Sequence, residues 1–345
     1  MNNVLPIHPE EVTTKLFGIL PKRTKDMLEM RFGLGKNVNR MTLEAIGKKY
    51  GITRERVRQV EADGITRIRK SVAMKEMAAV FESLENYFVE NGRVMHESTV
   101  LKNLAPHPKH ENHVYFLLTL SDPILRFHET DELKDRWAMG KEAEQNARKT
   151  LEHASEELRK VGRPISEGQL YDILSASTKN VVGNEEGKHV LVNWISLSKL
   201  ISKNYFDEWG LNEFSSIKPR GVRDLSYMVL GKRGSPLHFS GVATEIGKLI
   251  GKSVHVQTVH NELIKDPRFV LVGRGLYALN EWGYQPGIVR DVISDLLREH
   301  GPLSKEKIIS HVLERRFVKP NTVLINLENK KYFKKLPNGS YTTLR

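Results

Sequence analysis

Residues 43–60 read LEAIGKKYGITRERVRQV, and this stretch decides the fold of the first part of the chain. Its apolar residues recur at helical spacing on both sides of Gly51, and the pattern breaks at that glycine. Gly51 suits a left-handed turn residue, and Gly47 leaves room for a second helix to cross closely. Thr53 is a good N-cap for the residues that follow. The stretch therefore predicts a helix-turn-helix, two short helices joined by a tight turn.

The second helix is expected to begin near Thr53 and to carry a surface that reads DNA bases. Its predicted inward stripe consists of Val57, Val60, Ile65 and Ile68. The opposite side, within the first two turns, carries the candidate base-reading residues Arg54, Glu55, Arg58 and Gln59. Arginine can donate two hydrogen bonds to guanine, glutamine can pair with adenine, and glutamate can accept from cytosine. The alternative is a solvated, salt-bridged helix face, since Arg54 and Arg58 stand at i,i+4 spacing among acids.

Positive charge favours a polyanion as partner. The chain of 345 residues carries a formal net charge of +12, and the excess is concentrated in residues 1–75. Side chains around the two predicted helices are expected to contact phosphates, which position a protein on DNA without reading its sequence. These candidate phosphate contacts are Thr42, Lys48, Lys49, Thr53, Arg67, Arg69 and Lys70. We therefore expect double-stranded DNA as a partner, although solubility alone is the alternative reason for the charge.

Two longer stretches extend the pattern: residues 20–34 read LPKRTKDMLEMRFGL, and residues 41–70 read MTLEAIGKKYGITRERVRQVEADGITRIRK. Over residues 18–71 the chain resembles region four of housekeeping-type bacterial RNA polymerase sigma factors. In that family the region reads the upstream promoter hexamer, of the minus thirty-five type, and packs on the flap of the polymerase β subunit. The resemblance implies promoter DNA and the RNA polymerase core as partners. It also places base reading at the four polar residues of the second helix.

Two departures from the family pattern lead to further expectations. Gly64 falls where the family keeps a good helix former, so the second helix is expected to kink or fray there. Only residues 1–17 precede the domain, and the aromatic-rich segment that sigma factors use to melt the start site is absent. The chain is therefore expected to recognise promoter DNA without opening it alone.

The rest of the chain repeats itself after a helical connector over residues 72–90. Residues 222–224 open one unit with Val-Arg-Asp, and residues 289–291 open the next unit with the same three residue types. Later pairs share one offset, and these are Phe269 with Phe333, Gly275 with Gly339, and Tyr277 with Tyr341. Two fainter copies lie upstream. Each unit reads as a helix, a turn, two helices and a short hairpin, which is a winged-helix layout.

Residues 222–284 carry a second resemblance, in the runs GSPLHFSGVATEIGKLIGK (234–252) and DPRFVLVGRGLYALNEWGY (266–284). They resemble a HARE-type winged helix-turn-helix, a module that occurs in the delta subunit of RNA polymerase. The resemblance implies association with DNA or with the transcription machinery and implies no catalysis. A second surface for DNA or protein is expected at Lys252, His255, Gln257, His260 and Arg274. Ordinary surface charge around a protein-docking helix is an equally favoured interpretation.

The predicted fold class is all-α with small β-wings: an N-terminal helix-turn-helix domain followed by tandem winged-helix domains. The predicted domains are 1–75 for the region-four-like helix-turn-helix, 76–140 and 141–219 for two winged-helix-like repeats, 220–286 for the HARE-type winged helix, and 287–345 for the last winged-helix repeat.

Catalytic and metal chemistry finds little support in the sequence. There are no cysteines, which excludes disulfides and thiolate zinc sites. Residues 247–253 read GKLIGKS, with three residues between the glycines where a phosphate loop needs four. Three histidines at 107, 110 and 113 could hold zinc, but a solvated loop with a helix start is the favoured interpretation. We predict a protein that is not an enzyme and has no cofactor or metal.

No run of eighteen apolar residues and no secretory signal stand in the sequence, so we expect no membrane partner and a cytoplasmic, nucleoid-associated protein. The leading functional prediction is a sequence-specific DNA-binding transcription initiation factor or regulator. Two alternatives stay open: an RNA polymerase-binding adaptor with weak DNA binding, and an accessory DNA-specificity protein of a restriction or defence system. The base-reading residue types favour the first, because an adaptor has no need for them.

Overall fold

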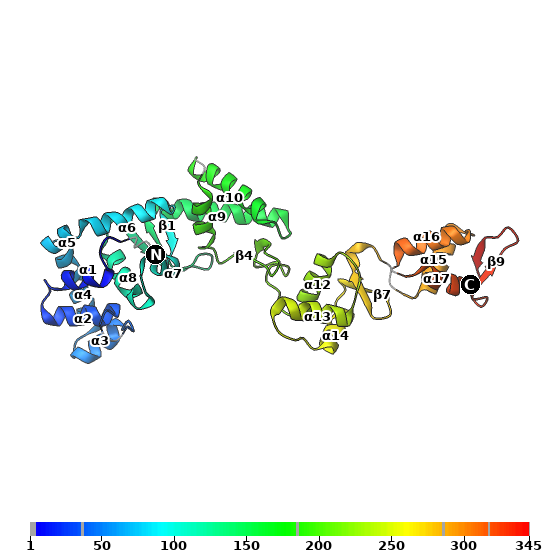
Figure 1. Ribbon diagram of the computed structural model, residues 1–345, viewed down its shortest axis with the longest axis horizontal. Helices are drawn as coiled ribbons and strands as arrows, with labels where there is room; N and C mark the ends of the chain where they lie inside the picture. Colours follow the sequence, from blue (N-terminus) through cyan, green and yellow to red (C-terminus); the bar gives the residue numbers. More distant parts are fainter. Residues whose placement is uncertain (1–4, 36–37, 184–185, 285–286, 317, 345) are drawn as a thin grey trace. The chain divides into compact units, whose positions relative to one another are not determined.

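The computed structural model describes residues 5–35, 38–183, 186–284, 287–316 and 318–344. It is mostly helical, with small antiparallel sheets, as the sequence predicts (Figure 1). The chain divides into two compact units, the first formed by residues 1–202 and 209–212 and the second by residues 203–208 and 213–345. Within the described residues, no helix combines the length and the apolar character needed to cross a membrane.

Four helices open the first unit, and they include the predicted helix-turn-helix (Figure 1). They are α1 (Pro9–Phe17), α2 (Lys22–Phe32), α3 (Leu43–Tyr50) and α4 (Arg54–Arg69). The turn between α3 and α4 consists of residues 51–53, so the predicted helix-turn-helix is confirmed.

Local chemistry explains why the chain turns where it does. The Thr42 hydroxyl accepts a hydrogen bond from the backbone N–H of Ala45 at 3.1 Å, and this caps the start of α3. Gly51 ends α3 with φ +64°, a left-handed conformation that favours glycine. A Cβ on Gly47 would lie 2.7 Å from the carbonyl oxygen of Ile52, so only glycine allows this close return of the chain.

The expected fraying at Gly64 is wrong, because α4 runs from Arg54 to Arg69 without a break. Gly64 is buried, and a Cβ at this position would lie 2.7 Å from Leu28 Cδ1 and 3.1 Å from Thr24 Cγ2. Glycine thus lets α2 approach α4 closely. Packing between the two helices outweighs the low helix propensity of glycine, which is worth about 1 kcal/mol.

Helices α1, α2 and α4 share one hydrophobic core with the segment that follows them. This segment contains α5 (Val72–Glu76), α6 (Ala78–Glu90), β1 (Val94–His96), α7 (Glu97–Leu104), the 3₁₀ turn η1 (Pro108–His110), α8 (Glu111–Leu120), β2 (Ile124–Phe127) and β3 (Arg136–Met139). Phe116 of α8 lies edge-on to Phe17 and Phe32, with ring centroids 5.0 and 4.9 Å apart. The first helices therefore pack directly on α8, which places the helix-turn-helix against the next segment.

One order of elements recurs four times in the described residues: a helix, a short strand or bridge, two helices and a hairpin. The first copy runs from α6 to β3, with strand order β1-β3-β2. The second contains α9 (Gly140–Val161), α10 (Glu167–Val182), α11 (Lys188–Ile195), β4 (Ile201–Lys203) and β5 (Trp209–Leu211). In this copy a single bridge between Ile165 and Trp209 takes the place of the first strand.

The second unit holds the other two copies, each with its own core. The third contains α12 (Val222–Arg233), β6 (Leu237–His238), α13 (Phe239–Ile250), α14 (Val256–Lys265), β7 (Phe269–Gly273) and β8 (Leu276–Leu279), with strand order β6-β8-β7. The fourth contains α15 (Val289–His300), α16 (Lys305–Arg315), α17 (Pro320–Leu327), β9 (Phe333–Lys335) and β10 (Tyr341–Thr343), with a bridge between Leu303 and Tyr341.

Candidate nucleic-acid interface

The outer side of α4 presents the four predicted base-reading residues to solvent. Arg54, Glu55, Arg58 and Gln59 are all exposed at the N-terminal end of the helix. Val57, which lies among them in sequence, is only 2% exposed and packs in a small core with Met27 and Ile46. The burial of Val57 fixes which way α4 faces, so the four polar side chains necessarily point outward.

The polar residues of α4 are partly paired with one another. Arg58 donates two hydrogen bonds to the Glu55 carboxylate, from Nε at 2.9 Å and from Nη2 at 2.7 Å. The hydrogen bonds from Arg58 hold the pKa of Glu55 below its usual value. Because more than half of each side chain is exposed, the pair is weak, and Arg58 can exchange Glu55 for another partner.

Arg56 belongs to this surface and was not predicted from the sequence. It is exposed in the first turn of α4, and its Nη1 donates to Gln59 Oε1 at 3.1 Å. Its position two residues after the start of α4 is a signal that sequence reasoning could have used. Arg56 therefore adds a fifth polar side chain to the outer side of α4.

The predicted phosphate contacts fall into three groups. Lys48, Lys49, Arg67 and Lys70 are exposed, and Lys49 Nζ also lies 3.2 Å from the sulfur of Met30. Thr42 and Thr53 use their hydroxyls to cap α3 and α4, which leaves each at the positive end of a helix. Arg69 alone forms the third group, because its guanidinium is bonded to another part of the chain.

Arg69 is held by the end of α8 and the residues that follow it. Its guanidinium donates to the carbonyl oxygens of Leu120 at 3.1 Å and Thr119 at 2.9 Å, and it pairs with Asp122 at 3.1 Å. These bonds fasten the C-terminal end of α4 to the neighbouring segment. The side chain of Arg69 is therefore less available to a phosphate than the exposed cations are.

The predicted second surface is divided by the structure. Lys252, His255, Gln257 and Arg274 are exposed, whereas His260 is half-buried. The His260 ring stacks on Phe239 with centroids 4.2 Å apart and lies edge-on to Tyr277. His260 therefore supports the packing of α13 on α14, and the other four residues remain on the surface.

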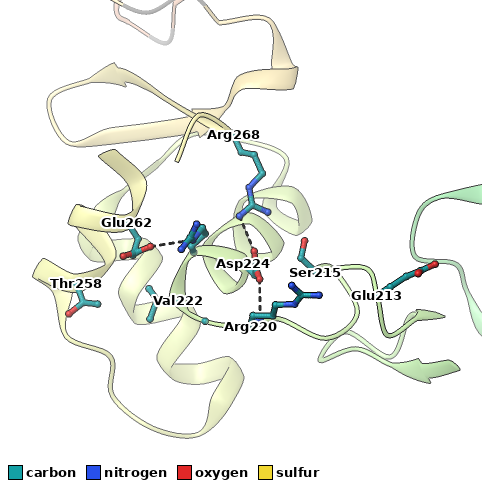
Figure 2. A pocket seen from close by; sticks show the side chains of 10 residues that line it. Glu213, Ser215, Arg220, Val222, Asp224, Thr258, Glu262 and Arg268 are labelled. Carbon is teal, nitrogen blue, oxygen red and sulfur yellow. Dashed lines mark hydrogen bonds and ion pairs between the residues drawn. The ribbon is translucent and has the colours of Figure 1, made fainter. Parts of the chain in front are cut away.

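A polar cavity of about 730 Å³ opens at the start of α12 in the third copy (Figure 2). Arg268 donates to Asp224 at 2.9 Å and pairs with Asp266 at 2.7 Å, which raises the pKa of Arg268 above its usual value. Arg223 lies 3.4 Å from Glu262. Because these arginines are matched by carboxylates, the cavity offers balanced charge rather than a basic surface for DNA.

Comparison with known proteins bears on the first four helices. Residues 16–70 match the family model described as Sigma-70, region 4. The match covers the end of α1 and all of α2, α3 and α4, and it agrees with the resemblance noted in the sequence over residues 18–71.

Three relatives show how far the similarity extends. The chain is 33% identical over 88 residues to RNA polymerase sigma factor RpoD of Neisseria gonorrhoeae, which covers 24% of this chain and 14% of the relative. It is 43% identical over 56 residues to RpoS of Coxiella burnetii, with 16% of each chain covered. It is 40% identical over 63 residues to SigA of a Bacillus species, with 18% and 16% covered. The chain thus spans less than a fifth of the length of these three relatives.

Proposed function

We propose that this chain is a sequence-specific DNA-binding transcription initiation factor or regulator that inserts α4 into the major groove of an upstream, minus thirty-five type promoter element. The observation that carries the proposal is the exposure of Arg54, Glu55, Arg58 and Gln59 on a helix whose inner side is fixed by Val57. These side chains offer donors and acceptors that base edges require. The match of residues 16–70 to the Sigma-70 region 4 model and the similarity to sigma factors support the same assignment.

Phosphate contacts would position α4 in the groove. Lys48 and Lys49 lie at the end of α3, and Arg67 and Lys70 lie near the end of α4, all exposed. The helix starts at Thr42 and Thr53 add backbone N–H groups and the positive end of the helix dipole. We leave Arg69 out of the contact set, because its guanidinium is bonded to the end of α8.

RNA polymerase core is the proposed protein partner, with the flap of the β subunit as the contact that the family resemblance implies. The relatives support this, since each is named as a sigma factor of RNA polymerase. The chain would act by binding, on the nucleoid of the cytoplasm, and not by catalysing a reaction.

The four recurring copies are proposed to be tandem winged helices over 76–140, 141–219, 220–286 and 287–345, the third of them a HARE-type module. Their common order of helix, strand or bridge, two helices and hairpin supports this assignment. In the third copy Val256 is 40% exposed and Ile264 is 62% exposed on α14. Exposed apolar side chains on this helix favour contact with protein over contact with DNA.

One observation favours the alternative of a polymerase-binding adaptor with weak DNA binding. Arg58 already donates two hydrogen bonds to Glu55. DNA binding must therefore break this pair or place both side chains in the groove together. An adaptor would keep the pair intact, and its affinity for DNA would not depend on Arg58.

A binding experiment with two readouts tests the proposal. Fluorescence anisotropy of a labelled promoter duplex is expected to show specific binding by the full chain and weaker binding by Arg58→Ala, while a tagged chain captures RNA polymerase core in both forms. Capture of polymerase with identical DNA binding by both forms would favour the adaptor. Specific DNA binding without polymerase capture would favour the accessory DNA-specificity protein.

A further inference from the structure

A cluster of histidines joins the start of α1 to the start of α8. His110 of the PHPKHENH run contacts His8, which lies more than 90 residues away in sequence, and the rings of His107 and His113 lie beside that of His110. His110 is 6% exposed and His113 is 7% exposed, so the expected solvated loop is wrong for these two residues. His107 alone of the three is exposed, and it caps η1 by accepting from the N–H of Lys109 at 3.2 Å.

Three residues of this cluster point ligand atoms at one another. One nitrogen each of His8 and His110 and one carboxylate oxygen of Glu10 all lie within 4.8 Å of each other. The His8 and His110 rings stand edge-on with centroids 4.4 Å apart, and His110 Nε2 lies 3.2 Å from Glu10 Oε2. Two imidazoles and a carboxylate are a common ligand set for zinc in proteins.

The ring nitrogens of His110 lack well-formed hydrogen bonds. Neither makes a hydrogen bond of good geometry with any of the described residues, although Nε2 lies 3.2 Å from the Glu10 carboxylate. A buried polar nitrogen without a well-formed hydrogen bond costs free energy, and native proteins rarely leave one in that state. A bound metal ion would satisfy the nitrogen that faces His8 and Glu10.

Burial, followed by the neighbouring His8 and Lys109, lowers the pKa of His110 below its usual value. His113 is held separately, since its Nδ1 lies 2.6 Å from the Thr13 hydroxyl, which also donates to the Glu10 carbonyl at 3.0 Å.

We propose that His8, Glu10 and His110 bind one zinc ion, which fastens the start of α1 to the start of α8. Zinc ligands about 2.0–2.2 Å from the ion lie about 3.3 Å apart in a tetrahedron. The side chains of His8 and Glu10 are partly or fully exposed, so they can rotate inward by the ångström or so that this geometry requires. The fourth position would be taken by water.

Zinc would stabilise the packing that positions the helix-turn-helix. The ion would join residues 8–10 to residue 110, across the same face where Phe17 of α1 meets Phe116 of α8. A ligand that binds only the folded arrangement shifts the equilibrium toward it. Zinc is therefore expected to slow local opening of α1.

The test uses the full chain, stripped with a chelator and then titrated with zinc chloride, with magnesium chloride as the metal control. Two variants remove ligands while keeping the fold. His8→Asn keeps a good N-cap for α1, where His8 now accepts from the N–H of Glu10, and Glu10→Gln keeps the size of the side chain. The matched control is His128→Ala, since the His128 side chain is 80% exposed and lies outside the cluster.

The expected result is uptake of one equivalent of zinc, at least tenfold weaker in His8→Asn and in Glu10→Gln and unchanged in His128→Ala. Hydrogen exchange in residues 9–17 should slow on addition of zinc in the wild type and should not respond in His8→Asn. Binding by both ligand variants at wild-type strength would overturn the proposal. Equal loss in His128→Ala would also overturn it, because it would show adventitious binding to surface histidines.

Discussion

Residues 46–51 read IGKKYG and residues 246–251 read IGKLIG, and both stretches end one helix and lead to a second. Ile46 and Ile246 are fully buried, while Gly51 and Gly251 end their helices at φ +64° and +70°. The connections differ, since residues 51–53 join α3 to α4 and residues 251–255 join α13 to α14.

The surfaces that follow these two turns are not alike. The start of α4 is capped by Thr53 and exposes Arg54, Arg58 and other polar residues. The start of α14 follows His255, whose side chain forms no capping hydrogen bond in the described structure, and the helix exposes Val256 and Ile264. The same helix-turn-helix geometry thus presents a polar surface on α4 and exposed apolar residues on α14. The exposed residues, and not the turn, determine which kind of partner each helix suits.

The largest expected difference between the two helices concerns specific DNA binding. Arg58→Ala should weaken binding to the preferred promoter duplex by about 1–3 kcal/mol, because a donor pair to a base is lost. Gln257→Ala on α14 should leave that affinity unchanged. Competition titrations on base-substituted duplexes measure the affinity of each variant. Equal losses of affinity in the two variants would contradict the prediction that α4, and not α14, binds the promoter element.

The next difference is in stability. Gly47→Ala should lower the free energy of unfolding by about 2 kcal/mol, because the added Cβ would lie 2.7 Å from a backbone oxygen. The equivalent Cβ on Gly247 would lie 3.3 Å from the Lys252 oxygen, and the gain in helix propensity offsets this contact. Gly247→Ala should therefore stay within about 1 kcal/mol of wild type in calorimetric unfolding.

Capping gives a smaller contrast. Thr53→Ala removes a hydroxyl that accepts from the Arg56 N–H at 3.1 Å, and it should destabilise the first unit by about 1 kcal/mol. His255→Ala should change stability by only a few tenths of a kcal/mol, since no capping bond is lost. Thermal unfolding of the two variants compares them directly. A larger effect at His255 would show that α14 depends on its first residues in a way that the capping pattern does not explain.

The smallest expected effect is on salt dependence. Lys49→Ala should weaken binding to all DNA sequences alike and should reduce the slope of log K against log salt by about one. Lys252→Ala should leave the slope as it is, if α14 does not track phosphates. Titrations at several salt concentrations with specific and unrelated duplexes provide the measurement. A change in base preference in Lys49→Ala would contradict its role as a phosphate contact.

Sequence reasoning succeeded where the cause is local. The roles of Gly51, Gly47 and Thr53 follow from backbone sterics and capping within a few residues, and the structure confirms all three. The outward placement of the polar residues of α4 likewise follows from helical periodicity and the burial of Val57. That these residues read DNA bases remains a prediction.

Sequence reasoning failed where the cause lies far away in the chain. Gly64 stands in an unbroken helix and packs against Leu28 of α2, and the periodicity within α4 does not indicate that contact. His110 is buried because α1 covers it, and Arg69 is occupied because the end of α8 accepts its hydrogen bonds. Each miss depends on a partner more than 30 residues away in the chain, which no local pattern reveals.

The packing of α8 on α1 and α2 has a practical consequence for anyone who wishes to excise the helix-turn-helix. A fragment that stops at residue 75 would lack Phe116, and the rings of Phe17 and Phe32 that now enclose it would meet water. Such a fragment would be prone to self-association through the exposed rings. A fragment that keeps this helix-turn-helix folded must therefore extend at least through the end of α8 at Leu120.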